Sequence, residues 1–144
     1  MNSLFQSTNN KKNYHLFVSH AWDYKTHYYT IEEWLKNNNI SFSNYSVPKH
    51  DPLDVSTNKA LENALYERIR LSSGIIIIAG MYATYSRWID YELESAHNLN
   101  KPIIAIRPRG QERIPKKIQK YATTIVGWNS NSLIDAIKNM KKPV

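Results

Sequence analysis

The sequence contains no cysteine among its 144 residues. This absence excludes disulfides, thiolate catalysis and cysteine-based metal sites together. The chain also has no apolar run of about 18 residues, and its first ten residues contain no hydrophobic segment typical of a signal peptide. We therefore expect a cytoplasmic protein that does not enter a membrane.

Several motifs of known chemistry are absent as well. No G-x-G-x-x-G follows a strand, and no G-x-x-x-x-G-K-[ST] occurs, so neither nucleotide-binding fingerprint is present. The chain has no H-E-x-x-H, its five histidines lack metal-ligand spacing, and no G-x-S-x-G elbow supplies a hydrolase nucleophile. Ala79 and Gly80 follow the third apolar strand, where a phosphoacceptor receiver domain needs an aspartate. We expect no metal site.

The charge that is present is mostly positive. The formal net charge is +7, while the 42% hydrophobic and 22% charged residues are ordinary for a globular protein. Such a charge suits nucleic acid, a smaller anion such as a dinucleotide pyrophosphate, or simply a solvated basic surface, and charge alone does not decide among them. The basic residues gather in one region, which comprises Arg107, Arg109, Arg113, Lys116, Lys117 and Lys120.

Apolar strand patterns alternate with helical ones along the chain. This alternation predicts an α/β fold, a flavodoxin-like five-stranded parallel sheet in the order 2-1-3-4-5 with helices on both faces. The run Gly74–Gly80, with four isoleucines, predicts a central strand that is buried on both faces. The other expected strands are Tyr14–Ser19, Ile40–Ser43 at an edge, Lys101–Ile106 and Thr123–Val126, and the expected helices are Thr26–Asn37, Thr57–Leu71, Arg87–Leu99 after a loop, a short turn within Ile114–Tyr121, and Ser130–Met140.

One acid stands out in the helix expected from Arg87 to Leu99. At 100° per residue, its apolar residues fall within an arc of roughly 140°, and Glu92 falls inside that arc. Asp90 and Glu94 lie on the opposite side. A carboxylate on a core-facing stripe needs a partner or a function, so Glu92 is either half of a buried ion pair or a functional residue.

The predicted topology gives this acid a place. In the order 2-1-3-4-5, the crevice opens at the carboxyl ends of strands 1 and 3. Ser19–Asp23 and Gly80–Glu92 arrive there, and the loop Asn44–Val55, with two prolines, lies beside them. Alternatively, Ser19, His20 and Asp23 are ordinary hydrogen-bonding residues at a strand end, and Trp88 is a core residue.

Four segments, in order, resemble TIR domains. Leu16–Lys25 resembles the first strand and loop of the family, which run into Ser-His-Ala and an acid. Tyr45–Asp54 stands where the family has a mobile loop after its second strand. Trp88 and Glu92 have the spacing of the family's Trp and Glu, and Lys101–Ile106 resembles the strand that follows them. The resemblance covers roughly residues 14–140. It favours a single TIR-like domain over residues 14–144, preceded by a loose leader over residues 1–13. The chain resembles the TIR-like component of Thoeris anti-phage defence.

This resemblance implies an activity and a site. In the family, the residue that matches Glu92 is catalytic in NAD cleavage, with NAD as substrate and no cofactor. Nicotinamide leaves as a neutral base, so a single carboxylate is sufficient, whereas conventional glycosidases use two. Glu92 is therefore the expected catalytic residue, and the expected substrate-binding residues are Ser19, His20, Ala21, Trp22, Asp23, Tyr45, Pro48, Lys49 and Trp88.

The resemblance leaves the product open. A diffusible cyclic ADP-ribose-type messenger that activates a separate effector fits a free-standing enzyme better than a self-contained toxin, and plain hydrolysis to ADP-ribose is the close alternative. A non-catalytic TIR module that acts through its surfaces is the competing class. The resemblance also allows a homo-oligomer formed through TIR surfaces and an enzyme that is active only when triggered or assembled. Nucleic-acid binding through the basic region ranks last, because no nucleic-acid motif accompanies the charge.

Overall fold

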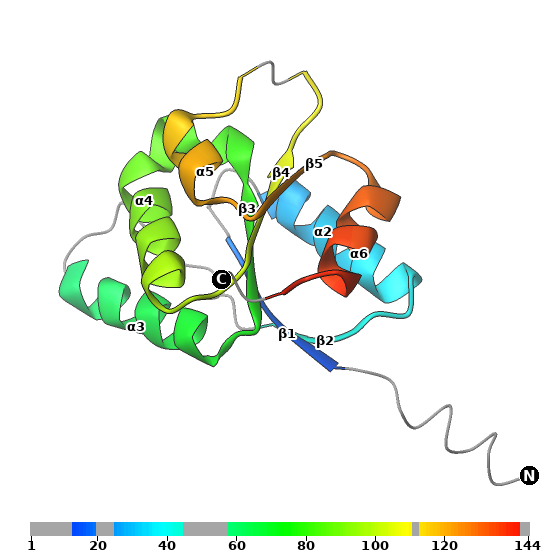
Figure 1. Ribbon diagram of the computed structural model, residues 1–144, viewed down its shortest axis with the longest axis horizontal. Helices are drawn as coiled ribbons and strands as arrows, with labels where there is room; N and C mark the ends of the chain where they lie inside the picture. Colours follow the sequence, from blue (N-terminus) through cyan, green and yellow to red (C-terminus); the bar gives the residue numbers. More distant parts are fainter. Residues whose placement is uncertain (1–12, 20–24, 45–57, 111–112, 142–144) are drawn as a thin grey trace, which may run out of the picture.

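Five parallel strands form one sheet, between two layers of helices (Figure 1). The computed structural model describes residues 13–19, 25–44, 58–110 and 113–141. The strand order is β2-β1-β3-β4-β5, and every neighbouring pair is parallel. The predicted order and the edge position of the second strand are confirmed. The strands are β1 (Asn13–Val18), β2 (Ser41–Asn44), β3 (Gly74–Ile78), β4 (Ile103–Arg107) and β5 (Thr124–Gly127).

The helices cover both faces of the sheet. α3 and α4 lie on one face and contact each other, α5 packs against α4, and α2 and α6 lie on the other face (Figure 1). Each helix turns an apolar stripe inward, because its hydrophobic residues recur every three to four positions. The helices are α2 (Lys25–Asn37), α3 (Asn58–Leu71), α4 (Tyr82–Asn98), α5 (Lys116–Tyr121) and α6 (Ser130–Lys138).

The core is centred on β3. All five of its residues are buried, since helices cover it on one side and on the other. Its isoleucines align in register with β4, where Ile75 pairs with Ile103 and Ile76 with Ile104. β-branched side chains suit such a doubly covered strand because they pack well on a pleated surface. The predicted central strand is thus confirmed.

Asparagine ends two helices on the chain's return to the sheet. Asn39 follows α2 with φ 56°, and Asn100 follows α4 with φ 61°. Asparagine tolerates the left-handed region better than other residues with a side chain, apart from glycine. Each asparagine therefore turns the chain directly from a helix into the strand beside it.

One predicted boundary is wrong. A loop was expected from Gly80 to about Arg87, but a 3₁₀ turn, η2 (Ala79–Met81), leads straight into α4 at Tyr82. Between Gly80 and Pro102 the chain has neither glycine nor proline to stop a helix. The aromatic and β-branched residues there lower helix propensity by only a few tenths of a kcal/mol each, which tertiary packing readily overcomes.

Candidate active site

Ser19 and Glu92 meet at the carboxyl end of β1. The Ser19 hydroxyl donates a hydrogen bond to Glu92 Oε1 at 2.8 Å. Both side chains are buried, with 1% of Ser19 and 5% of Glu92 exposed. The structure therefore brings together two of the residues that the topology had placed at this crevice, although they are 73 positions apart in the chain.

The sheet fixes Ser19. Its backbone N–H donates to the Ile76 carbonyl at 2.8 Å, which continues the pairing of β1 with β3 one residue past the strand end. The serine is thus held by the sheet, and its side-chain direction follows from the alternation along β1.

α4 carries Glu92 to the same place on its buried stripe. Ile89, Leu93 and Ala96 lie on that stripe and are fully or almost fully buried. Glu92 stands ten residues into the helix, about 15 Å along its axis. The first turns of α4 must therefore project beyond the strand ends, so that Glu92 comes level with Ser19.

Burial changes the acidity of Glu92. The loss of hydration raises the pKa of its carboxyl from 4.5 to about 7, while the hydrogen bond from Ser19 acts in the opposite direction. Burial disfavours the charged form, whereas a donated hydrogen bond favours it. Near neutral pH the group therefore exists in both protonation states.

The ion-pair alternative finds no support around Glu92. Within the described part of the chain, the salt bridges join other residues, and no cation lies within ion-pair distance of this carboxylate. Among the described residues, burial and Ser19 shift the pKa of Glu92, and no charged group does. Among the described residues, the buried acid therefore has a hydroxyl and no cation as its partner.

Trp88 precedes Glu92 by one helical turn. The indole is 7% exposed, and the Arg87 guanidinium lies over its ring, 4.7 Å from the ring centre. This arrangement fits a packed residue with one covered face. A role for Trp88 in binding substrate stays a prediction.

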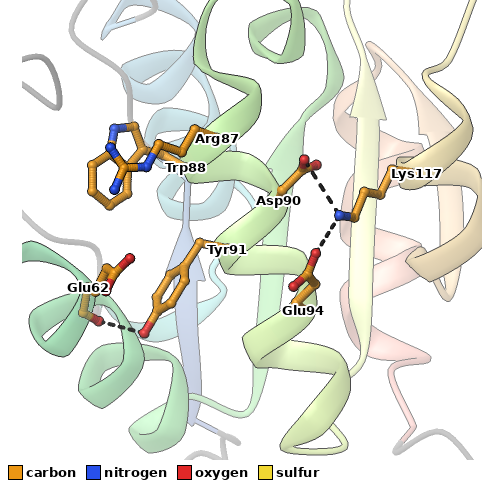
Figure 2. Close-up of a pocket in the computed structure, with 7 residues that line it drawn as sticks. All are labelled: Glu62, Arg87, Trp88, Asp90, Tyr91, Glu94 and Lys117. Carbon is orange, nitrogen blue, oxygen red and sulfur yellow. Dashed lines mark hydrogen bonds and ion pairs between the residues drawn. The ribbon is translucent and has the colours of Figure 1, made fainter. Parts of the chain in front are cut away.

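A pocket of about 270 Å³ lies beside Trp88, on the side of α4 away from the sheet (Figure 2). Its walls come from three helices, and the lining residues are Glu62 of α3, Arg87, Trp88, Asp90, Tyr91 and Glu94 of α4, and Lys117 of α5. Glu92 does not line it. Three carboxylates face two cations, so the lining is unsuited to a pyrophosphate.

Polar contacts on two flanks hold α4 at this pocket (Figure 2). On one flank, the Tyr91 hydroxyl donates to the Glu62 carbonyl at 3.0 Å. On the other, the Lys117 ammonium bonds to Glu94 and lies 3.6 Å from Asp90 Oδ2. Lys117 belongs to the predicted basic region, and the sequence did not reveal that two acids of α4 neutralise it. No motif or periodicity marks these contacts, because they join separate helices.

The remaining predicted site residues lie outside the part of the chain that the structure describes. They are His20, Ala21, Trp22 and Asp23, which follow β1, and Tyr45, Pro48 and Lys49, which follow β2. Their proposed contacts with substrate stay predictions.

Two searches of the described residues bear on other classes of site. No group of three or more His, Asp or Glu side chains is arranged to hold a metal ion among them. No helix among the described residues has both the length and the apolarity that spanning a bilayer demands.

Comparisons with known proteins identify a family and a fold. The model of the family described as "Thoeris protein ThsB, TIR-like domain" matches residues 17–113, which include Ser19 and Glu92. No curated protein matches the chain. Among solved structures, the chain is similar to the CMP N-glycosidase BcmB of Clostridium botulinum, with a TM-score of 0.54 and 10% identity over 86% of this chain and 98% of that one. A 3-dehydroquinate dehydratase-like protein from Bifidobacterium longum matches with a TM-score of 0.49 and 10% identity, over 88% of this chain and 93% of that one.

Proposed function

The chain belongs to the family of the TIR-like domain of the Thoeris protein ThsB, and from this membership we propose that it is an enzyme that cleaves the nicotinamide–ribose bond of NAD. The product that we propose is a cyclic ADP-ribose-type messenger, which activates a separate effector in anti-phage defence. The observation that carries the proposal is the buried Glu92, bonded to Ser19 at the carboxyl end of β1.

One carboxylate is enough for this chemistry. Nicotinamide in NAD is a cationic pyridinium, so it departs as a neutral base and needs no acid to protonate it. As the bond from the ribose carbon to the ring nitrogen breaks, positive charge develops on the ribose. A preorganised carboxylate in a water-poor site stabilises that charge strongly. Glu92 supplies this negative charge in its ionised form.

The solved structures add a limited argument. The CMP N-glycosidase BcmB has the same fold, and its name states that it cleaves an N-glycosidic bond. At 10% identity the likeness extends to the fold alone. It is compatible with a glycosidic-bond chemistry on this sheet but does not select NAD.

Mass spectrometry of NAD incubated with the purified protein tests the proposal, with and without extract of phage-infected cells. Hydrolysis adds one water to the ADP-ribose product, whereas cyclisation does not, so the two products differ by the mass of water. We expect nicotinamide release and the cyclic mass. Release of nicotinamide with linear ADP-ribose alone would make the protein an NAD hydrolase, and intact NAD under every condition would favour the non-catalytic interaction module.

Glu92→Gln is the matched control. The amide keeps the shape of the side chain but removes the charge, so NAD turnover should fall on the order of 10²-fold or more. A Gln variant with wild-type turnover would remove Glu92 from the mechanism. Because no described cation depends on this carboxylate, the substitution should leave the protein folded, as circular dichroism can verify.

A further inference from the structure

Ser19 has one hydroxyl proton, and the structure shows where it goes. The hydroxyl donates to Glu92 Oε1, and the backbone N–H of the same residue is bonded to Ile76 across the sheet. The serine is 1% exposed. The backbone of Ser19 is therefore held by the pairing of β1 with β3, and its side chain is held by Glu92.

The two carboxylate oxygens of Glu92 differ in their surroundings. Oε1 accepts the hydrogen bond from Ser19. Oε2 has no hydrogen-bond partner within the described part of the chain, and the ion pairs found there leave Glu92 aside. Oε1 is thus bonded to a residue at the end of β1, and Oε2 is available to a ligand.

We infer that Ser19 is a positioning residue, whose hydroxyl holds Oε1 so that Oε2 of Glu92 is the oxygen that faces the ribose of the substrate. This inference rests on the proposed function and deepens it. It also changes the role expected from the sequence, which placed Ser19 in contact with substrate. While its single hydroxyl proton is donated to Glu92, Ser19 cannot donate a hydrogen bond to a ligand.

Positioning has a measurable electrostatic consequence. Burial raises the pKa of Glu92, and the Ser19 hydrogen bond opposes that rise. The charged groups Asp90, Glu94 and Lys117 pair with one another on the other side of α4. Loss of the hydroxyl should therefore raise the pKa of Glu92 further, by about one unit or more, as expected for a hydrogen bond to a charged group.

The test compares Ser19→Ala with Ser72→Ala. Ser72 is also a buried serine, 2% exposed, and its hydroxyl bonds to the Ile69 carbonyl at 2.7 Å at the end of α3. Both variants lose one buried hydrogen bond, but only one loses a bond to Glu92. Ser19→Thr, which keeps a hydroxyl, is the conservative variant.

The primary readout is the titration of the Glu92 carboxyl, followed by NMR of ¹³C-labelled full-length protein without substrate. We expect the midpoint to move upward by about one pH unit or more in Ser19→Ala, to stay unchanged in Ser72→Ala, and to return toward the wild type in Ser19→Thr. An unchanged midpoint in Ser19→Ala would overturn the inference. This readout needs no turnover, so it stands even if NAD proves not to be a substrate.

Turnover supplies the second readout. In Ser19→Ala the rise of kcat with pH should move to higher pH together with the titration, and kcat at pH 7 should fall about fivefold or more, while KM for NAD stays within about twofold. A large rise in KM with an unchanged pH profile would show that Ser19 contacts substrate instead, and would overturn the inference while leaving the proposed function intact. Absence of NAD turnover in the wild type would overturn only the proposed function.

Discussion

Glu92 is a carboxyl group that the fold buries beside a hydroxyl. Ionising a buried group is costly, and the cost appears as a pKa of about 7 in place of 4.5. At a pH where Glu92 is charged, its burial therefore lowers the free energy of unfolding. Buried groups with strongly shifted pKa values are found more often at functional sites than in purely structural cores.

The pH dependence of stability follows from this shift. Between pH 4.5 and about 7 the folded state keeps the Glu92 proton while the unfolded state has lost it. The contribution of Glu92 to stability is therefore fully present below pH 4.5 and is lost as pH rises through about 7, by about 3 kcal/mol at most. Urea unfolding of the wild type and of Glu92→Gln across this range measures the difference.

The Gln variant has no proton to lose at this position. We therefore expect it to become more stable relative to the wild type as pH rises from 5 to 8, by about 2–3 kcal/mol. A difference between the two proteins that stays constant with pH would contradict the raised pKa. A difference that moves in favour of the wild type would indicate a partner that stabilises the carboxylate.

Among the strands and helices, β3 and α4 have different roles in positioning Glu92. β3 supplies a rigid frame, since all its residues are buried and its neighbours on both sides are paired in register. α4 supplies the acid and is held on its flanks by Tyr91 to α3 and by Lys117 to α5. The position of Glu92 relative to Ser19 depends on both.

A smaller side chain in β3 tests how much the packing of this strand contributes to stability. Ile76→Val removes one methylene from a fully buried side chain, and we expect a loss of about 0.5–1.5 kcal/mol in the free energy of unfolding. Ile125→Val in the edge strand β5 is the matched control, because its side chain is 39% exposed and should cost less. Denaturant unfolding measures both, and equal losses would contradict the central position of β3.

In the molecule as a whole, whose net charge is +7, the basic residues differ in whether acidic side chains pair with them. Arg107, Arg109, Lys116 and Lys120 are exposed near the end of β4 and on α5, whereas Lys117 is paired with the acids of α4. Exposed basic side chains attract any polyanion by counterion release, without sequence preference.

We expect only weak retention of DNA or RNA by the full-length protein. Binding should fall steeply with salt and disappear near physiological ionic strength, because the attraction comes from phosphate contacts alone. Fluorescence anisotropy with a labelled duplex at several salt concentrations measures this. A complex that remains tight and sequence-specific at physiological salt would favour a nucleic-acid function over the enzyme.

The fold and the unusual acid could both be predicted from local patterns in the sequence. Four consecutive isoleucines between glycines favour a doubly covered strand, because β-branched residues and flanking glycines are typical of one. The 3.6-residue period placed Glu92 on the buried side of α4, because that pattern is also local. The start of α4 was missed, since weak propensities gave no stop signal and packing decided.

The surroundings of Glu92 depend on how separate elements pack. Whether a buried acid meets a cation or a hydroxyl depends on residues far along the chain, and no local pattern encodes that Ser19 lies 2.8 Å from Glu92 Oε1. The pairing of Lys117 with two acids of α4 has the same origin, because it joins elements separated by a strand. Local periodicity determines which face of an element is buried, but the packing of elements determines what each buried group touches.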